Sequence, residues 1–171
     1  NGDSRWARAY DLYIIASTGG TPKKVSETPD RSFGIIAWSS DAKAIYISEA
    51  DRTVNRIFAL PVDGGKVSVV TPGDGNYSGA SLSVDGNTLA FIHQTSEAPP
   101  DIFAMSMKKR EMKKLTEVHS DLPKLTLGRT EVIKWKSKDG REIEGLLTYP
   151  VNYMKGEKYP LILNVHGGPA G

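Results

Sequence analysis

The sequence WSSDAKAIYI at residues 38–47 decides the fold, because it occurs twice in the chain. LSVDGNTLAF at residues 82–91 has the same polar turn and the same apolar run after it. The two copies are 44 residues apart, counted from Asp41 to Asp85. A pattern that returns at such a distance indicates a repeat architecture, in which each repeat is one unit of several short elements.

Two further landmarks return at nearly the same period. DLYI at residues 11–14 resembles RIFA at 56–59 and DIFA at 101–104, each copy 45 residues after the last. The same spacing of 45 residues separates Gly-Gly at 19–20 from Gly-Gly at 64–65, and Thr71 from Thr116. Three independent landmarks at one period establish the repeat.

Each repeat unit reads as short strands joined by turns. The apolar runs at residues 12–16 and 57–61 lead to Gly-Gly pairs, which permit the positive φ of hairpin turns. A unit of 44–45 residues with about four strands is typical of a β-propeller blade. The sequence therefore predicts a mainly β fold: a partial β-propeller of about two and a half four-stranded blades, from Asp11 to about Pro123. The alternative is a β-sandwich, whose regular turns do not repeat residues at a fixed period.

The repeats resemble those of Tol-system propellers. The family pattern has Trp-Ser-Pro-Asp-Gly at the first turn, and the residues that carry the resemblance are WSSDAK, SVDGN and DGG before a short strand and Thr-Pro. Ser40 and Val84 stand where proline is usual, and Ala42 stands where glycine is usual. These departures leave the period intact.

The repeat ends near Pro123, and a different pattern follows. Residues 131–137 alternate polar and apolar side chains, KDGR at 138–141 predicts a hairpin turn, and residues 142–149 predict the returning strand. LILNV at residues 161–165 is apolar at successive positions, as expected of a strand buried inside a sheet. We therefore expect two domains: the C-terminal blades of a propeller over residues 1–123, and the N-terminal strands of an incomplete α/β-hydrolase domain over residues 124–171.

The final loop carries the chemistry of this second segment. The expected strand leads to His166-Gly167-Gly168-Pro169, and a strand that ends in His-Gly-Gly matches the loop that supplies half of the oxyanion hole in α/β-hydrolases. Preorganised backbone N–H groups must point at the oxygen that becomes an anion when a nucleophile attacks a carbonyl. Glycine lets the backbone approach, and removing one such donor typically costs about 2.7–4 kcal/mol of transition-state stabilisation.

From Glu131 onward the chain resembles the opening of the catalytic domain in the prolyl oligopeptidase family of serine peptidases, most closely its acylaminoacyl-peptidase and dipeptidyl-peptidase-like branch. The motifs that carry the resemblance are WKSKDG, IEG, YP, KYPL and NVHGGP. The resemblance implies an upstream propeller, a peptide substrate and a backbone N–H donor at Gly168, with Gly167 shaping the loop. His166 stands where some branches place a tyrosine that reaches the oxyanion, which favours the backbone donor.

The nucleophile of this fold would lie on a Gly-x-Ser-x-Gly elbow, followed by Asp and then His. The sequence contains no such elbow, since GNYSG at residues 75–79 has its serine one place late. His166 precedes any nucleophile, so its position excludes it as the triad base. We therefore expect the triad outside these residues and no peptidase activity from this chain alone, with the remainder of the same protein completing both domains.

Composition restricts the other function classes. The 22 Lys and Arg against 20 Asp and Glu give a net charge of +2, which predicts neither a nucleic-acid nor a membrane partner. The chain has no cysteine, which excludes disulfides and thiolate metal sites, and His93 and His119 lack partners at ligand spacing. No cofactor or metal is expected, whereas the oligomeric state and the compartment, cytoplasmic or periplasmic and secreted, stay open.

Two other functions remain open. One is a non-catalytic propeller that binds a protein partner, which would continue after Pro123 with another repeat. The other is an esterase on the same scaffold, because an oxyanion loop does not identify the acyl group.

Overall fold

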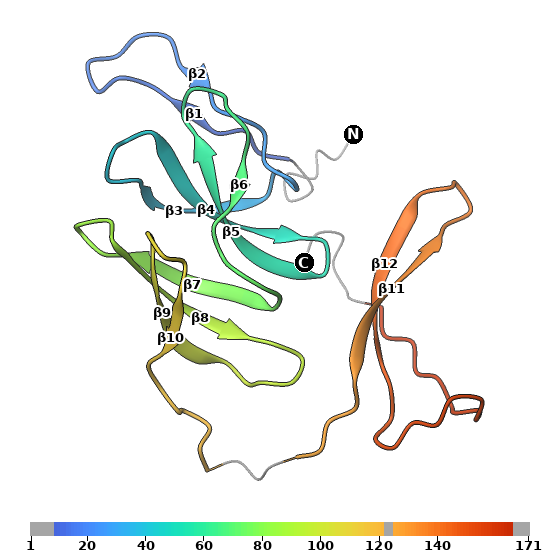
Figure 1. Cartoon of the computed structure of the whole chain (residues 1–171). Helices are drawn as coiled ribbons and strands as arrows, with labels where there is room; N and C mark the ends of the chain where they lie inside the picture. The colour runs from blue at the N-terminus through green and yellow to red at the C-terminus, as the bar shows by residue number, and fades with distance from the viewer. Residues whose placement is uncertain (1–8, 122–124, 166–171) are drawn as a thin grey trace.

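A computed structural model describes residues 9–121 and 125–165 of the chain. These residues form strands and loops without a helix (Figure 1). The strands are β1 Tyr13–Ile14, β2 Lys23–Lys24, β3 Phe33–Trp38, β4 Ala44–Asp51, β5 Val54–Pro61, β6 Ser68–Val69, β7 Asn76–Leu82, β8 Thr88–Gln94, β9 Asp101–Ser106, β10 Met112–Lys114, β11 Thr130–Lys136 and β12 Glu142–Thr148.

Two antiparallel sheets of four strands confirm the predicted blades. One has the strand order β3-β4-β5-β6, and the other has the same order in its own strands, β7-β8-β9-β10. The β1–β2 pair stands at the repeat positions of β5–β6 and supplies the predicted half blade. Each complete blade also has an irregularity between its first two strands, near residues 35–37 in one and 78–81 in the other. The structure is thus a partial β-propeller.

One turn recurs at the repeat positions. In the first blade the Ser39 hydroxyl donates to Asp41 Oδ1 at 2.7 Å and accepts the Ala44 N–H at 2.9 Å. In the second blade Ser83 donates to Asp85 Oδ1 at 2.6 Å in the same way. The residue after each aspartate has a left-handed backbone, with φ of 72° at Gly86 and 55° at Ala42. Glycine is therefore usual at this position because it adopts positive φ without the steric cost of a Cβ.

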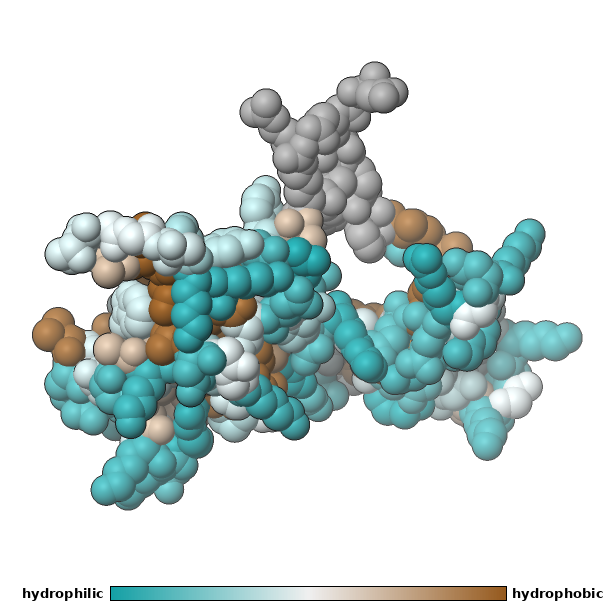
Figure 2. All heavy atoms as spheres, turned by 90° about the horizontal axis from the view of Figure 1, so that it is seen from above, coloured by the Kyte–Doolittle hydropathy of each residue, from teal (hydrophilic) through white to brown (hydrophobic). Residues whose placement is uncertain are grey.

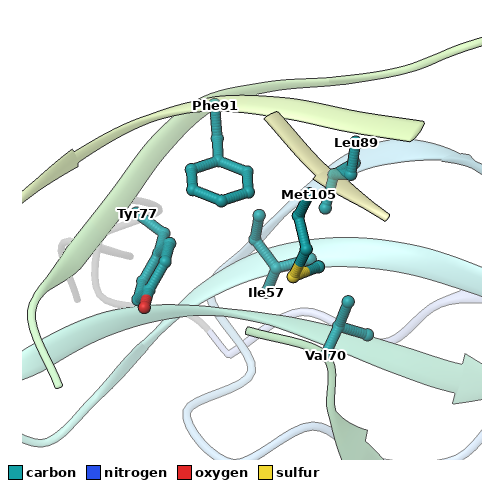
Figure 3. Close-up of a cluster of buried hydrophobic side chains, with 6 residues drawn as sticks. All are labelled: Ile57, Val70, Tyr77, Leu89, Phe91 and Met105. Carbon is teal, nitrogen blue, oxygen red and sulfur yellow. The ribbon is translucent and has the colours of Figure 1, made fainter. Parts of the chain in front are cut away.

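The main core lies between the two complete blades (Figure 3). Tyr77, Leu89, Phe91 and Met105 project from the second blade toward Ile57 on β5, and all five are almost fully buried. The rings of Tyr77 and Phe91 meet edge to face, with centroids 5.3 Å apart. A smaller cluster of Ile45, Ile47 and Phe58, with Leu12 and Ile14 packed on it, joins the first complete blade to β1–β2. Packing between neighbouring sheets thus holds β1–β2 and the two complete blades together.

The predicted hairpin after the blades is present as β11 and β12. They pair from Thr130 opposite Thr148 to Lys136 opposite Glu142. Their turn contains Gly140 at φ 83° and repeats the Ser-x-Asp hydrogen bond of the blades, here from Ser137 to Asp139. No strand interrupts the described residues between β10 and β11. The division of the chain near residue 123 stays a prediction.

The buried strand predicted at residues 161–165 is absent. These residues pair with no strand, and their side chains are exposed, Ile162 to 91%. A strand buried inside a sheet needs hydrogen-bonded neighbours at its edges and a cover on both faces, and the described residues supply neither to this segment. The apolar pattern was read correctly, but the burial inferred from it was wrong for the chain in this structure.

Candidate functional site

The predicted oxyanion loop, His166, Gly167 and Gly168, lies outside the described residues. The candidate site is therefore built from the elements that precede it, which are the hairpin β11–β12 and the edge of the blades that faces it. These two parts enclose a cavity of about 670 Å³.

Cross-strand contacts stiffen the hairpin. Lys134 on β11 donates to two carboxylates on β12, Glu142 at 3.2 Å and Glu144 at 2.8 Å. The Trp135 ring lies over Gly145 so closely that a Cβ at Gly145 would come within 3.0 Å of it. A side chain at position 145 would therefore push the Trp135 ring away, which gives a structural reason for glycine in the IEG motif.

An aromatic group follows the hairpin. The Tyr149 ring lies 4.5 Å from that of Tyr153, whose ring lies 5.3 Å from that of Tyr159, measured between centroids. The Arg129 guanidinium sits 4.6 Å above the Tyr149 ring, and the Tyr149 hydroxyl bonds to Glu131. That hydrogen bond, with burial, raises the pKa of Tyr149. These contacts anchor the polar connection to the base of the hairpin.

One ion pair joins the blades to the hairpin across the cavity. Arg52, in the turn between β4 and β5, donates to Glu144 at 2.6 Å. Glu144 also accepts from Lys134, and the hydrogen bonds from Lys134 and Arg52 lower the pKa of this carboxyl below its ordinary value. Glu144 therefore stays ionised at neutral pH and holds cations from both parts of the molecule.

The blade side of the cavity has a second arginine, Arg56 on β5. Its Nε donates to Asp51 at 3.1 Å and its Nη1 to the Gly73 carbonyl at 2.7 Å, while Nη2 lies 3.5 Å from Asp74. The other cavity walls include Thr95, Glu131 and Leu146. The cavity therefore mixes polar and apolar walls, and the charged groups Arg52, Arg56 and Glu144 are paired with neighbouring side chains.

Sequence analysis did not single out Arg52, Arg56 or Glu144. A signal for Arg56 existed in the repeat, because Asp11 and Asp101 stand at the corresponding positions of its neighbours. Both aspartates bind a lysine, Lys24 at 3.1 Å and Lys114 at 2.8 Å. The charge at this position of the repeat is thus reversed in Arg56, which lines the cavity. The Arg52–Glu144 pair spans 92 residues, and no local pattern indicates it.

Of the two histidines considered for metals, His93 has structural contacts. His93 Nε2 lies 3.0 Å from the Asp74 carbonyl oxygen, and the His93 ring lies 4.5 Å from that of Tyr77. Over residues 9–121 and 125–165, three His, Cys, Asp or Glu side chains nowhere gather as a metal site would require. The same residues contain no helix long and apolar enough to cross a bilayer.

Comparison with known proteins shows which proteins this chain resembles in sequence. The chain matches no family model. It is 26% identical over 159 residues to dipeptidyl-peptidase 5 of Porphyromonas gingivalis, a match that covers 92% of this chain and 23% of the relative. It is 28% identical over 170 residues to the probable dipeptidyl-peptidase 5 of Emericella nidulans, covering 96% of this chain and 23% of the relative. The chain is similar in sequence to these dipeptidyl-peptidases over most of its own length. The resemblance to that branch of the prolyl oligopeptidase family is confirmed.

Solved structures agree on the fold of this chain. The AtxE2 isopeptidase with bound Astexin3-dC4 superposes with a TM-score of 0.67 at 18% identity, covering 88% of this chain and 23% of that one. Dipeptidyl peptidase 4 of Porphyromonas gingivalis gives 0.62 at 12% identity, covering 88% and 22%. A TolB-like protein of Agrobacterium tumefaciens gives 0.52 at 16% identity, covering 82% and 66%. These neighbours support the propeller fold alone. The chain spans less than a quarter of the length of the curated relatives it matches.

Proposed function

We propose that this chain is part of a serine peptidase that hydrolyses short peptides by acyl transfer, in which propeller blades adjoin an α/β-hydrolase domain. The observation that carries the proposal is the similarity to dipeptidyl-peptidases over 92% of the chain, a length that includes blades and hairpin alike. A propeller that only binds partners has no need of the hairpin, whereas a peptidase of this family uses it to enter its catalytic domain. The proposed domain boundary lies between residues 123 and 124.

In this proposal the loop at residues 166–168 serves the chemical step. The Gly168 N–H donates to the oxygen of the tetrahedral intermediate, Gly167 gives the loop its close approach, and His166 contributes through its backbone. Such donors act because they are already oriented when the negative charge develops. Serine, aspartate and histidine of the triad come from outside this chain, because chain order places them after the loop.

The cavity between blades and hairpin supports a short peptide as substrate. Its volume of about 670 Å³ falls within the roughly 300–1,000 Å³ of small-molecule sites, a size that fits a few residues of extended peptide. Its polar groups offer partners for the carbonyl and amide groups of a peptide backbone, and its apolar walls offer contacts for side chains.

Two arms of one experiment test the proposal. The product of the complete reading frame that contains these residues is treated with a fluorophosphonate probe, beside the 171-residue chain. We expect stoichiometric labelling of the longer protein, release of peptide fragments from short substrates, and no labelling of the chain alone. Absence of both labelling and hydrolysis in the longer protein would refute the peptidase. Hydrolysis of acyl esters without hydrolysis of peptides would favour the esterase.

A second comparison isolates the loop. In the longer protein, Gly168→Pro removes the proposed N–H donor, and we expect kcat to fall about a hundredfold or more while labelling by the probe persists more weakly. Lys155→Ala, in the exposed connection before the loop, is the control and should leave kcat unchanged. Equal activity of the Gly168→Pro protein and the native protein would exclude Gly168 as the donor.

A further inference from the structure

The connection between β6 and β7, residues 70–75, is held by side chains from both complete blades. Arg56 on β5 donates from Nη1 to the Gly73 carbonyl at 2.7 Å, and its Nη2 lies 3.5 Å from the Asp74 carboxylate. From the second blade, His93 Nε2 lies 3.0 Å from the Asp74 carbonyl oxygen. A carbonyl oxygen only accepts, so this contact requires the proton on Nε2. Two successive carbonyls of the connection are therefore occupied by side-chain donors.

The same two positions of the repeat hold the connection before the first complete blade. Asp11 stands 45 residues before Arg56, and Glu49 stands 44 residues before His93. Both carboxylates accept hydrogen bonds from the connection between β2 and β3, at 2.7 Å and 2.9 Å. The first connection thus donates to acidic side chains, whereas the second accepts from Arg56 and His93. Holding the connection between sheets is the shared role of these positions, and its polarity is reversed in the second copy.

The second connection also forms part of the blade wall of the cavity. Asp74 and Gly75 line the cavity, as does Asn76 at the start of β7. Asn76 Oδ1 accepts the Asn55 N–H at 2.8 Å, which ties this segment to β5. Gly75 has a φ of 109°, and a Cβ there would lie 2.5 Å from the Gln94 carbonyl oxygen. The wall therefore has little room to change its backbone path.

We propose that Arg56 and His93 are positioning residues, which fix this connection as a preformed wall of the substrate cavity. The inference rests on the proposed function, because it assigns the wall a role in binding the peptide. Most of the surface visible in Figure 2 is hydrophilic, so water is the alternative partner for a carbonyl that loses its donor. Such a wall would hold its binding geometry for only part of the time, and the apparent affinity for substrate falls by that fraction.

Peptide hydrolysis by the longer protein tests the role of Arg56. We expect Arg56→Ala to raise KM for a short peptide about tenfold and to leave kcat within about twofold, because only the population of the binding geometry changes. Arg56→Lys keeps the charge but loses the planar fork that reaches Gly73 and Asp74 together, so KM should stay raised. Arg110→Ala is the matched control. Arg110 donates to the Val70 carbonyl of the same connection at 2.9 Å but does not line the cavity, so its loss should leave KM unchanged.

Two variants of His93 separate its N–H from its ring. His93 does not line the cavity, so an effect on KM must pass through the connection. His93→Phe keeps a ring for the contact with Tyr77, 4.5 Å away between centroids, and removes the donor; we expect KM to rise about threefold or more. His93→Gln keeps a side-chain N–H and should recover part of that loss. Hydrogen exchange read by mass spectrometry should be faster at residues 70–76 in Arg56→Ala and His93→Phe, and unchanged in β9.

Several outcomes would overturn the proposal. Hydrolysis with an unchanged KM in Arg56→Ala and His93→Phe, or unchanged exchange at residues 70–76, removes the positioning role and leaves the proposed function intact. Recovery of KM in Arg56→Lys would show that only the charge matters, and an equal rise of KM in Arg110→Ala would assign the effect to lost stability. Absence of hydrolysis in the native longer protein would overturn the proposed function and this role with it. Circular dichroism checks that each variant folds, and Arg56→Gln replaces Arg56→Ala if that variant does not.

Discussion

The blades and the hairpin use the same turn, yet only the blades enclose a core. Ser39, Ser83 and Ser137 each begin a Ser-x-Asp turn with a left-handed residue after the aspartate. In the blades the strands that follow bury side chains between sheets, whereas the hairpin leaves Trp135 and Leu146 exposed. Local hydrogen bonds thus set the turn and register of a strand pair, but a core requires a second sheet to cover it.

The largest expected effect separates the two regions by the free energy of unfolding. Phe91→Ala empties a site in the core between blades, and we expect a loss of about 3–5 kcal/mol. Trp135→Ala removes an exposed ring from the hairpin and should cost about 1 kcal/mol or less. Urea unfolding, followed by circular dichroism, measures both changes. If Phe91→Ala does not fold, Ile57→Val serves instead, with an expected loss of about 0.5–1.5 kcal/mol. If Phe91→Ala and Trp135→Ala lowered the free energy of unfolding equally, the core between the blades would contribute no more to stability than the hairpin.

The Ser-x-Asp turn has glycine after the aspartate in one blade and alanine in the other, so each residue can be exchanged for the other. Gly86→Ala forces a side chain into positive φ and places its Cβ 2.7 Å from that of Ser40, so we expect a loss of about 1–2 kcal/mol or more. Ala42→Gly relieves the same strain in the first blade and should stabilise the chain by less than about 1 kcal/mol, because glycine also loses more backbone entropy. Urea midpoints compare the two. Destabilisation by Ala42→Gly would show that the strain at Ala42 is smaller than the backbone entropy that glycine loses on folding.

Acid should weaken the turns before it affects the core. Hydrogen bonds from Ser83 and the Asn87 N–H lower the pKa of Asp85 to about 2, from about 3.9 in an unfolded chain. A carboxyl with a depressed pKa stabilises the fold above its unfolded pKa, and this contribution is lost as the pH falls toward the folded value. We expect the urea midpoint to fall between pH 4 and pH 2, and Asp85→Asn to reduce that dependence. An unchanged pH profile in Asp85→Asn would assign the acid sensitivity elsewhere.

The smallest expected effect tests the contact between the two regions. The Arg52–Glu144 pair lies partly in solvent, so a double-mutant cycle of Arg52→Ala and Glu144→Ala should give a coupling of about 0.2–1 kcal/mol that declines with added salt. Arg141→Ala is a control, since Arg141 pairs only within the hairpin turn, with Asp139. Zero coupling at low salt would mean that the pair does not join hairpin and blades.

Much of the fold could be predicted from the sequence, because the features that carried it are local. The 44–45-residue period located the blades, and the hairpin was predicted to within a residue or two at each strand. The prediction failed at residues 161–165, where alternation and apolar character were used to infer burial. An apolar segment becomes a buried strand only when other strands flank it, and sequence pattern does not report the flanking strands.

The candidate site divides in the same way. The loop at residues 166–168 came from a short motif and stays a prediction, whereas the cavity and its Arg52–Glu144 pair were visible only once the hairpin had been placed beside the blades. Arg56 could be predicted in part. The sequence shows that it departs from the repeat, but it does not show that Asp51 and Asp74 are its partners.

The sequence by itself determined the repeat, the turns and the strand pairs of this protein, because those depend on hydrogen bonds and backbone preferences within a few residues. Only the tertiary structure decided which faces are covered, which charges meet across the cavity and which apolar side chains remain in water. Those outcomes depend on contacts between segments tens of residues apart, and the same apolar residue is core or surface according to whether a second sheet covers it: Ile57 is buried, and its repeat counterpart Ile102 is exposed.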